Sequence, residues 1–531
     1  MEEKDLTFSD FFRGFDAIGK GEWITAYASR GDPPEGPVFY SALIREERVP
    51  SSLENPSWDL SIGNGFPGFS FHFEDGKEVA TYFRCSDEGI EPLVILRSFF
   101  GIRKSYWEVA EEFRFYFNLY EDQPNKKFLF INDNGDEEDA VLMSDNEIKI
   151  KGRLIKEFLA AKNMRLALFF DINRFSEKPL KELSINEYHD ERKGHNFVIS
   201  IGARPSSFGS RSQSHGFLIG KKLIAGLPNF TPNILNRKDK TFIDFIIGLD
   251  EHGADISYTC DESRLGNYFG KNPDSPQYVT PVFFKKEVLS KYYAQPGKYS
   301  VEDGSVSCGG LWSLRMDNND PKSVMVLLGD LGHLSHTEQS YWRTFSVASG
   351  KMSRTAFARS FEGEFADPEN PELLFKQKFG VFQGKWEEKF GWKFFKPMTE
   401  GDAYYIKTLR VPLTNEQREF DEQVLTLAKI LIDSLNEKEL SKGLTLAKEN
   451  PKGLDKLEAF LAARDIKFTQ MEFLRKLQEL RSAATAHRKG KRYEDVKEFF
   501  GIGQKDFPLV FEDILKKCIW TLNSLETHLL K

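Results

Sequence analysis

The sequence predicts a multidomain α+β protein, in which a strand-rich amino-terminal region of two blocks is followed by an all-α helical bundle. Its 531 residues exceed one hydrophobic core, because cores stop growing at roughly 250 to 300 residues. Up to about residue 410, short apolar runs alternate with Gly, Asn, Asp and Pro, which is typical of strands joined by turns. Beyond that point, apolar residues recur at helical spacings. We therefore expect domains at residues 1–205, 206–410 and 411–531.

The first block contains the clearest predicted hairpin. Residues 128–131 form a short apolar run, and the sequence Asn132-Asp133-Asn134-Gly135 follows it. Asn and Gly tolerate the positive φ of a hairpin turn, so we expect a turn there. The other expected elements are strands at 140–143, 147–150 and 166–171 and a helix at 153–164 whose Leu154, Phe158 and Leu159 share one side.

The second block, residues 206–410, is the expected sensor region. Apolar runs predict strands at 196–202, 242–249, 278–284 and 324–328. The segment 204–214 contains five Ser, one Pro and one Gly, a composition typical of a mobile loop or a joint between blocks. We place the boundary between the two blocks beside this segment.

The helical region after Pro412 opens with Thr414 and Gln417, which have the spacing of a capping box. The first expected helix ends near Gly443, and its apolar face consists of Phe420, Val424, Leu427, Leu431 and Leu435. Thr469 and Glu472 repeat the capping pattern. Three further helices are predicted over 454–461, 473–480 and 511–525. Four helices of this kind form a bundle of ordinary domain size.

Charge and cysteine content restrict the classes of function. The net charge is −8, but residues 411–531 hold 21 Lys and Arg against 20 Asp and Glu, so the acidity lies in the first 410 residues. Any contact with nucleic acid must therefore come from a local basic patch. The four cysteines include no CxxC pair, which argues against zinc knuckles and disulfide frameworks. The acidic amino terminus and the lack of long apolar runs predict a cytoplasmic protein without membrane segments.

The segment 480–493 carries the most informative pattern in the chain. Arg481 and His487 enclose the small residues Ser482, Ala483, Ala484, Thr485 and Ala486. A run of small side chains lets another helix or a substrate approach closely, and the two ends supply polar groups. RNA can be cleaved by its own 2′-hydroxyl, which requires only a group that titrates near neutrality and a fixed cation beside the phosphate. Arg481 and His487 are suited to these roles and are our candidate catalytic pair.

This pattern, an Arg and a His separated by five residues within a helical bundle, resembles the signature of HEPN ribonucleases. The resemblance covers about the last 120 residues. It implies metal-independent RNA cleavage without a cofactor, a phosphate-orienting role for Arg481 and proton transfer by His487. It also implies a homodimer or higher homo-oligomer that pairs through this domain. The commonest form of the signature has Asn after the Arg, where this chain has Ser482.

A basic segment follows the candidate pair. Arg488, Lys489, Lys491 and Arg492 supply four cations next to Tyr493, so we predict that these five residues bind RNA, with the Tyr ring stacking on a base. The alternative is a solvated helix end for the cations and ordinary packing for the Tyr. Six positions on a helix rotate by roughly 240° net, so Arg481 and His487 do not share one face of a continuous helix. Either the helix ends before His487 or a second protomer completes the site.

Proteins that combine a large amino-terminal region with such a domain resemble bacterial anti-phage and abortive-infection factors. The expected function is a defence-type effector, a toxic endoribonuclease controlled by an amino-terminal sensor that responds to a phage or other protein trigger. The alternative is a non-catalytic interaction protein whose bundle dimerises or binds nucleotide or RNA. His333 and His336 have a spacing that metal sites use, but no carboxylate or Cys pattern accompanies them, so a loop is the preferred interpretation.

Overall fold

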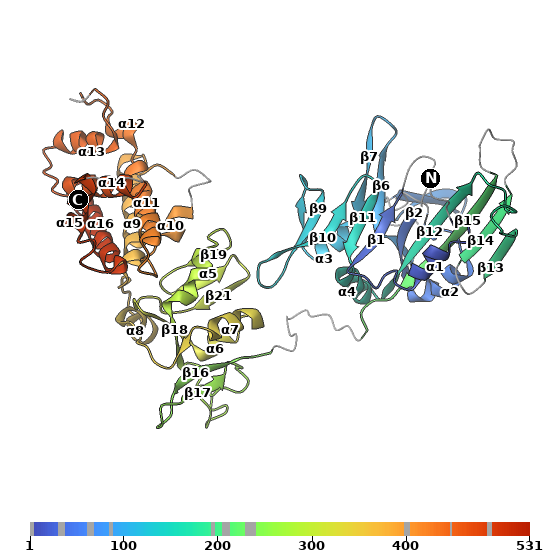
Figure 1. Ribbon diagram of the computed structural model, residues 1–531, viewed down its shortest axis with the longest axis horizontal. Coiled ribbons are helices and arrows are strands. Elements are labelled where there is room, and N and C mark those ends of the chain that lie inside the picture. The colour runs from blue at the N-terminus through green and yellow to red at the C-terminus, as the bar shows by residue number, and fades with distance from the viewer. Residues whose placement is uncertain are drawn as a thin grey trace. The chain divides into compact units, whose positions relative to one another are not determined.

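The computed structural model describes residues 5–29, 38–60, 68–83, 89–192, 197–203, 213–228, 241–397, 404–445, 449–485 and 491–530. The chain divides into two compact units, and Figure 1 draws both. The amino-terminal unit comprises residues 1–132 and 136–238, and the carboxyl-terminal unit comprises residues 239–531 together with 133–135. The predicted mixed α+β organisation, with a strand-rich amino-terminal region and a helical carboxyl-terminal region, is confirmed.

The amino-terminal unit is built on one 11-stranded sheet whose named pairs are antiparallel. In spatial order its strands are β13 (Tyr188–Arg192), β14 (Phe197–Ala203), β15 (Ser214–Ile224), β12 (Met164–Ser176), β2 (Val38–Arg45), β1 (Trp23–Ala28), β11 (Glu147–Lys151), β10 (Glu137–Met143), β9 (Lys127–Ile131) and β8 (Tyr120–Asp122), with β5 (Ile90–Pro92) beside β2. The long strand β12 lies between β2 and β15 and pairs with both. Its run of buried apolar residues is typical of a central strand.

Helices and two separate hairpins complete this unit. The helices are α1 (Ser9–Phe15), α2 (Val49–Glu54), α3 (Glu111–Tyr116) and α4 (Gly152–Lys162), with a 3₁₀ turn at Glu46–Arg48. The hairpins are β3 (Gly68–Glu74) with β4 (Lys77–Phe83) and β6 (Val94–Phe99) with β7 (Arg103–Val109). Helix α4 buries Leu154, Phe158 and Leu159, as its sequence pattern predicts. The predicted strands around it are also confirmed.

The segment 204–214 does not join two blocks. Strands β14 and β15 on either side of it pair from Phe197 with Gly220 to Ala203 with Ser214, so both belong to the same sheet. The division between the compact units falls at residues 238 and 239. A composition rich in Ser and Gly is equally typical of a long hairpin connection, and this explains the difference from the expected boundary at residue 205.

The first part of the carboxyl-terminal unit carries small antiparallel sheets. They comprise β16 (Asp244–Leu249) with β17 (Asp255–Thr259), β22 (Ser323–Leu327) with β18 (Pro281–Lys285) and β23 (Ser346–Val347), and β19 (Tyr299–Val301) with β20 (Ser305–Cys308) and β21 (Trp312–Arg315). The short helical elements are a 3₁₀ turn at Lys286–Leu289, α5 (Ser290–Tyr293), α6 (Leu328–Leu331), α7 (His336–Arg343), α8 (Arg354–Phe357) and a π-turn at Ala358–Glu362. Trp342 and Tyr292 are fully buried in its core.

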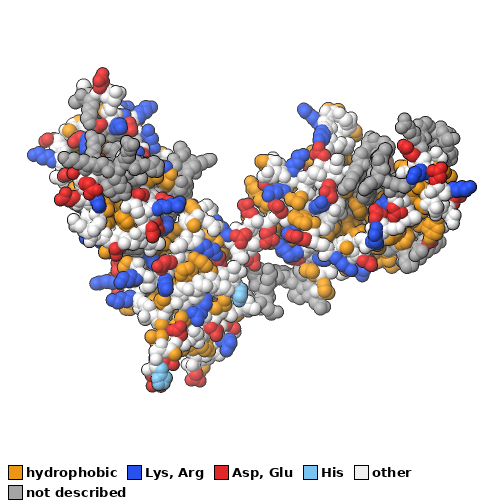
Figure 2. Space-filling view, in the orientation of Figure 1, with side chains coloured by type: hydrophobic (Ala, Val, Ile, Leu, Met, Phe, Trp, Pro, Cys, Tyr) orange, Lys and Arg blue, Asp and Glu red, His pale blue; other side chains and the backbone are white. Residues whose placement is uncertain are grey.

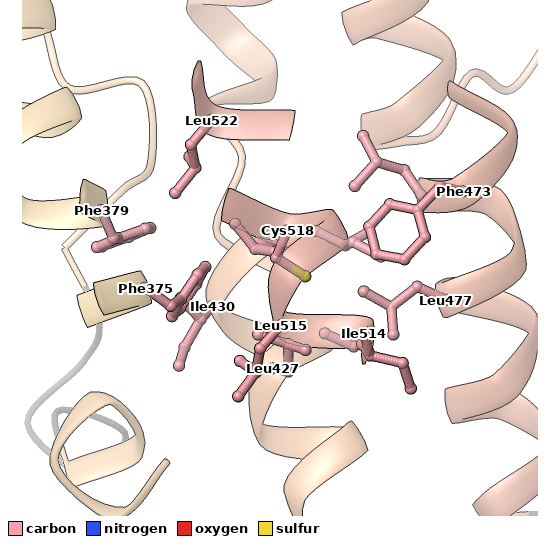
Figure 3. Packing of buried hydrophobic residues seen from close by; sticks show 14 of the residues in the cluster. Phe375, Phe379, Leu427, Ile430, Phe473, Leu477, Ile514, Leu515, Cys518 and Leu522 are labelled. Atoms are coloured by element: carbon pink, nitrogen blue, oxygen red, sulfur yellow. The ribbon is translucent and has the colours of Figure 1, made fainter. Parts of the chain in front are cut away.

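The helical bundle forms the remainder of this unit. Its elements are α9 (Pro371–Phe390), α10 (Tyr404–Thr408), α11 (Gln417–Ala428), the π-helical segment η5 (Lys429–Asp433), α12 (Glu437–Leu440), α13 (Gly453–Ala462), α14 (Met471–Thr485), α15 (Lys491–Phe500) and α16 (Phe507–Leu529). Figure 3 shows side chains from α9, α11, η5, α14 and α16 meeting in one core. Of the described helices, none is long and apolar enough to cross a membrane.

The bundle differs from its prediction in three respects. It begins near Pro371, ahead of the expected residue 411, because Phe375 and Phe379 of α9 belong to the helical core. The predicted capping box is wrong, since α11 has Glu416 at its N-cap position and the Thr414 hydroxyl donates instead to Glu419. The first helix does not continue to Gly443. It passes into the π-helical segment η5, and Asn436 then caps the short helix α12.

Candidate functional site

Helix α14 positions Arg481, the first residue of the candidate pair. Its side chains at Phe473, Leu474, Leu477 and Leu480 are buried in the bundle core, as their spacing predicts. This buried face fixes the rotation of the helix about its axis. Arg481 follows Leu480 directly and lies four residues after Leu477, so it stands at the rim of the buried face. Its side chain is 28% exposed to solvent.

The guanidinium of Arg481 is held by a carboxylate from another helical element. Its Nη1 atom donates to Oδ1 and Oδ2 of Asp433, at 2.5 and 2.6 Å. Asp433 is the last residue of η5, and its side chain is 43% exposed. A pair with this much solvent contact contributes at most about 1 kcal/mol to stability. The contact therefore orients the guanidinium. Because the pair is weak, little free energy is lost when another anion replaces Asp433 as the partner of Arg481.

The backbone that presents Asp433 is unusual. Segment η5 is π-helical and interrupts the regular geometry that α11 begins. Its residues Ile430, Leu431 and Ile432 are buried, so the turn is held by the core and Asp433 is left at its end. π-turns within helices are rare and occur frequently at functional sites. Sequence reasoning missed Asp433, because its partner lies 48 residues away and no local pattern links the two.

The side chains of the other predicted site residues lie outside the described part of the structure. His487, Arg488 and Lys489 lie outside the described residues. Lys491, Arg492 and Tyr493 open helix α15, and the positions of their side chains are likewise outside the described part of the structure. The described part of α14 extends to Thr485, two residues before His487. The structure thus brings Arg481 to Asp433 and leaves its relation to His487 as a prediction.

Ser482 occupies the position at which the HEPN signature commonly has Asn. Its hydroxyl donates to the backbone oxygen of Gln478, at 2.9 Å. Such a bond to the preceding turn is a usual arrangement for a Ser within a helix. Comparison of the chain with protein-family models, curated proteins and solved structures found no match. The resemblance to HEPN proteins therefore rests on the motif and on its helical surroundings.

A second arginine on α14 provides an internal comparison for Arg481. The Nη2 atom of Arg475 donates to Asp455 at 3.1 Å and to Glu458 at 2.6 Å, and both acceptors belong to α13. Its side chain is partly exposed, as is that of Arg481. Arg475 therefore has the same residue type, helix and kind of partner, but lies six residues further from the small-residue segment. Arg475 is therefore a matched control for substitutions of Arg481.

The histidines singled out in the first part of this unit contribute to a hydrogen-bonded group. The Tyr278 hydroxyl donates to Asp330 at 2.7 Å, and Nε2 of His333 lies 3.1 Å from the same oxygen. Burial, and then the hydrogen bond to Asp330, raises the pKa of Tyr278. His336 begins helix α7. Within the described ranges, no group of three or more His, Cys, Asp or Glu residues is arranged to hold a metal ion.

A cavity of about 530 Å³ lies within the carboxyl-terminal unit, where the bundle packs on the strand-bearing part. Its lining includes Lys286, Tyr293, Glu372 and Arg410. The Lys286 ammonium donates to the backbone oxygens of Asn318 and Asp320, at 2.6 and 2.8 Å, and burial lowers its pKa to about 8. Tyr293 donates to Glu372 at 3.0 Å. Lys286, Tyr293 and Glu372 thus each have a hydrogen-bond partner within the unit, which favours a structural role for this junction.

The distribution of charge agrees with the near neutrality of the bundle sequence. Figure 2 shows acidic and basic side chains interspersed over the visible face of each unit. On α14, the side chains of Arg475 and Arg481 meet carboxylates of the neighbouring elements α13 and η5. A surface of this kind offers no long-range attraction for a polyanion. RNA contact would therefore depend on the basic segment 488–492 beside the candidate pair.

Proposed function

We propose that the helical bundle is a metal-independent endoribonuclease of the HEPN type. The observation that carries the proposal is the Arg481–Asp433 pair, which orients a guanidinium at the rim of α14 next to the segment that contains His487. An oriented cation reduces the reorganisation required when charge develops on a phosphate. The small residues between Arg481 and His487 support close approach by a substrate or a second protomer.

The chemistry follows from these two side chains. His487 accepts the proton of a ribose 2′-hydroxyl, whose oxygen attacks the adjacent phosphorus. Negative charge builds on the non-bridging oxygens, and Arg481 stabilises it. The bond to the 5′-oxygen breaks, and that oxygen is protonated by an acid of the site or by water. The products carry a 2′,3′-cyclic phosphate and a 5′-hydroxyl.

The strand-rich amino-terminal unit is assigned the regulatory role in this proposal. The complete protein would be a cytoplasmic, bacterial defence-type effector in which a phage or other protein trigger acts on the amino-terminal unit. Two bundles would pair as a homodimer or a higher homo-oligomer, so that each composite cleft contains two candidate pairs. The division of the chain into two compact units supports a separation of regulation from cleavage.

The deciding experiment incubates the purified full-length protein with total RNA in excess chelator. We expect cleavage that persists without divalent cations and leaves cyclic phosphate or 3′-phosphate ends. His487→Ala should abolish cleavage, while His528→Ala, which alters an exposed histidine of α16, should leave it intact. Cleavage by His487→Ala at the wild-type rate would contradict the assignment.

A non-catalytic interaction protein is the second candidate. The hydrogen bond from the Arg481 guanidinium to Asp433 favours this second candidate, because a purely structural arginine would also have a carboxylate partner. In that case RNA would remain intact at every protein concentration, and the bundle would dimerise or bind nucleotide or RNA equally well with and without His487. Intact RNA together with unaltered binding by His487→Ala would select this alternative.

A further inference from the structure

The β6–β7 hairpin of the amino-terminal unit has a firmly packed base. Val94 and Val109, at its two ends, are fully buried. The ring of Trp107 lies against that of Tyr27 on β1, with 3.8 Å between the ring centroids. On its outer side, the Lys104 ammonium lies 2.7 Å from Asp145 in the turn between β10 and β11. Figure 1 shows the hairpin projecting beyond the sheet from this base.

The stem between base and tip is ordered by side-chain stacking. The rings of Phe99 and Tyr106 stack with centroids 5.6 Å apart. The guanidinium of Arg97 lies 5.8 Å from the Phe99 ring centroid and 3.2 Å from Glu108 on the opposite strand. These contacts arrange the stem before any partner binds. A preorganised element loses less conformational entropy on binding than a flexible loop does.

The backbone at the tip adopts a conformation that phenylalanine disfavours. Phe100 has φ 56° and Gly101 has φ 77°, and the amide of Ile102 donates to the Phe99 oxygen at 2.9 Å. Two central residues with positive φ form a type I′ turn, which prefers Asn-Gly or Asp-Gly. For a bulky side chain, a positive φ is a genuine outlier and costs stability.

Two other places in the same unit show that this choice of residue is unusual. The β3–β4 hairpin has the same signs of φ at its turn and uses the expected residues there, Asp75 at φ 49° and Gly76 at φ 74°. Phe8 is the other aromatic residue with positive φ among those described, but it is fully buried, so packing compensates its strain. Phe100 has no such compensation within the chain, because 96% of it is exposed.

We propose that this tip is a docking element for a partner protein. Phe100 and Ile102, which is 82% exposed, would insert into an apolar pocket of that partner. The strain at Phe100 and the exposure of both side chains are unfavourable in the free protein, and burial of the two side chains in a pocket offsets these costs. An aromatic anchor beside an arginine is also the composition that dominates the binding energy of protein interfaces.

The charge beside the tip specifies the rim of that pocket. Arg103 follows Ile102 and is exposed, and within the described residues its guanidinium forms no hydrogen bond or ion pair. Lys104 is already held by Asp145, and Arg97 by Glu108. Arg103 therefore remains for the partner, and a carboxylate at the pocket rim would complement it. The partner would present an apolar pocket with at least one acidic residue on its edge.

The same charges argue for a protein and against a lipid surface. Binding to anionic membranes generally uses clusters of four to eight Lys and Arg residues beside an apolar element. The hairpin offers Arg103 alone as an uncommitted cation among its described residues, on a chain with net charge −8. A single Phe and a single Ile give only marginal anchoring without such a cluster. A pocket of matching shape retains both side chains without this requirement.

The first step of the test identifies what the tip contacts. A photo-crosslinking amino acid is placed at position 100 of the full-length chain in living host cells, with and without phage infection. The same amino acid at position 115 is the control, because Phe115 is another exposed phenylalanine of the amino-terminal unit. We expect a protein adduct specific to position 100. A lack of such an adduct in both conditions, or an adduct only with a second copy of this chain, would overturn the proposal.

The second step measures binding of the purified captured protein to variants of the full-length chain. Phe100→Asn suits the turn better than the native residue, so it should bind at least tenfold more weakly while its thermal stability stays equal or rises. Arg103→Glu should also bind at least tenfold more weakly, and Phe115→Asn should bind as the wild type does. Equal affinity of Phe100→Asn and wild type would refute docking through the tip.

A vesicle assay distinguishes docking to a protein from binding to a lipid surface. Sedimentation with vesicles of phosphatidylcholine and phosphatidylserine should not distinguish wild type from Phe100→Asn. Vesicle binding by the wild type that Phe100→Asn abolishes would assign the tip to a membrane instead. Since every measurement concerns binding, loss of the ribonuclease proposal would leave the docking proposal intact, and the reverse also holds.

Discussion

The Nη1 atom of Arg481 lies 2.5 and 2.6 Å from the two carboxylate oxygens of Asp433, a residue 48 positions earlier in the chain. One partner comes from a regular helix and the other from the end of a π-helical segment. The contact therefore depends on an irregular backbone that the buried side chains of η5 maintain. It makes Asp433 a positioning residue in the proposed site and gives the proposal its most specific tests.

Replacement of Arg481 should affect catalysis far more than folding. We expect Arg481→Ala to reduce kcat for RNA cleavage by roughly 100-fold or more, the scale found when a charge-stabilising donor is removed. Its stability should fall by no more than about 1 kcal/mol, because the pair with Asp433 is partly exposed to solvent. Initial rates on a defined RNA substrate and thermal denaturation measure the two effects.

Arg475→Ala is the matched control for that experiment, since Arg475 also lies on α14 and also pairs with carboxylates. It should retain nearly full activity. An equal loss of activity in both variants would show that activity depends on the overall charge or the stability of α14. Arg481 would then have no specific role.

Asp433 should act through the orientation of Arg481. Asp433→Ala removes the acceptor for Nη1, so the guanidinium must reorganise in the transition state, and we expect kcat to fall about tenfold with little change in KM. Asp433→Asn keeps one acceptor oxygen and should recover part of the loss. Steady-state kinetics on the wild type and the two variants measure these effects. A higher kcat for Asp433→Ala would contradict the prediction and would show that the carboxylate competes with the phosphate for Arg481.

The core face of α14 should be essential for the bundle. Leu477 is fully buried and points toward Ile514 and Leu515 of α16, as Figure 3 shows. Leu477→Ala should therefore lower the free energy of unfolding by about 2 to 5 kcal/mol. Helical circular dichroism during denaturant titration follows this transition. Leu509→Ala, at a half-exposed position of α16, should change the midpoint very little.

Lys286 should make stability depend on pH above neutrality. Burial lowers its pKa from the ordinary value of 10.5 to about 8, so between these values the unfolded chain binds one more proton than the folded chain. The free energy of unfolding therefore rises with pH across this window, by up to about 3 kcal/mol, and the gain is absent below pH 8.

Denaturant titrations at pH 7.5 and pH 10 measure that gain. The wild type should gain stability relative to Lys286→Met over this interval, whatever constant offset the substitution introduces. Lys322→Met, at an exposed lysine near the same junction, should follow the wild type. Parallel pH profiles of the wild type and Lys286→Met would contradict the proton linkage.

Helices α11, α13, α14 and α16 were predictable because their apolar residues recur on one face. Leu454, Leu457, Phe460 and Leu461 are all buried in α13, as their spacing indicates. Helix α9 was missed although Phe375, Phe379, Phe382 and Trp386 also share a face. Aromatic residues favour strands, and Gly380 and Gly384 disfavour helices, so local propensity obscured the period that the bundle core enforces.

Features that depend on tertiary contact were not predictable from one sequence. Strands β16, β18 and β22 of the small sheets were located from their apolar runs. No local pattern, however, indicates that β14 pairs with β15 on the far side of residues 204–212. Arg481 was found from its motif, whereas its partner Asp433 has no motif and becomes visible only when η5 ends beside α14. A π-turn has no strong sequence signature, since core packing selects it.

The pairing of β1 with β11 has a consequence for the order of folding. Trp23 pairs with Lys151, and β2 pairs with β12 from Arg45 with Met164 to Val38 with Asp171. The middle of the sheet can therefore form only after loops of more than a hundred residues close. Such closure is slow, because chain entropy is lost before the new contacts compensate it. The β3–β4 and β6–β7 hairpins need only neighbouring residues and can form early. During synthesis, β1 and β2 stay without those partners until the later strands emerge, an interval in which assistance from a chaperone would be most useful.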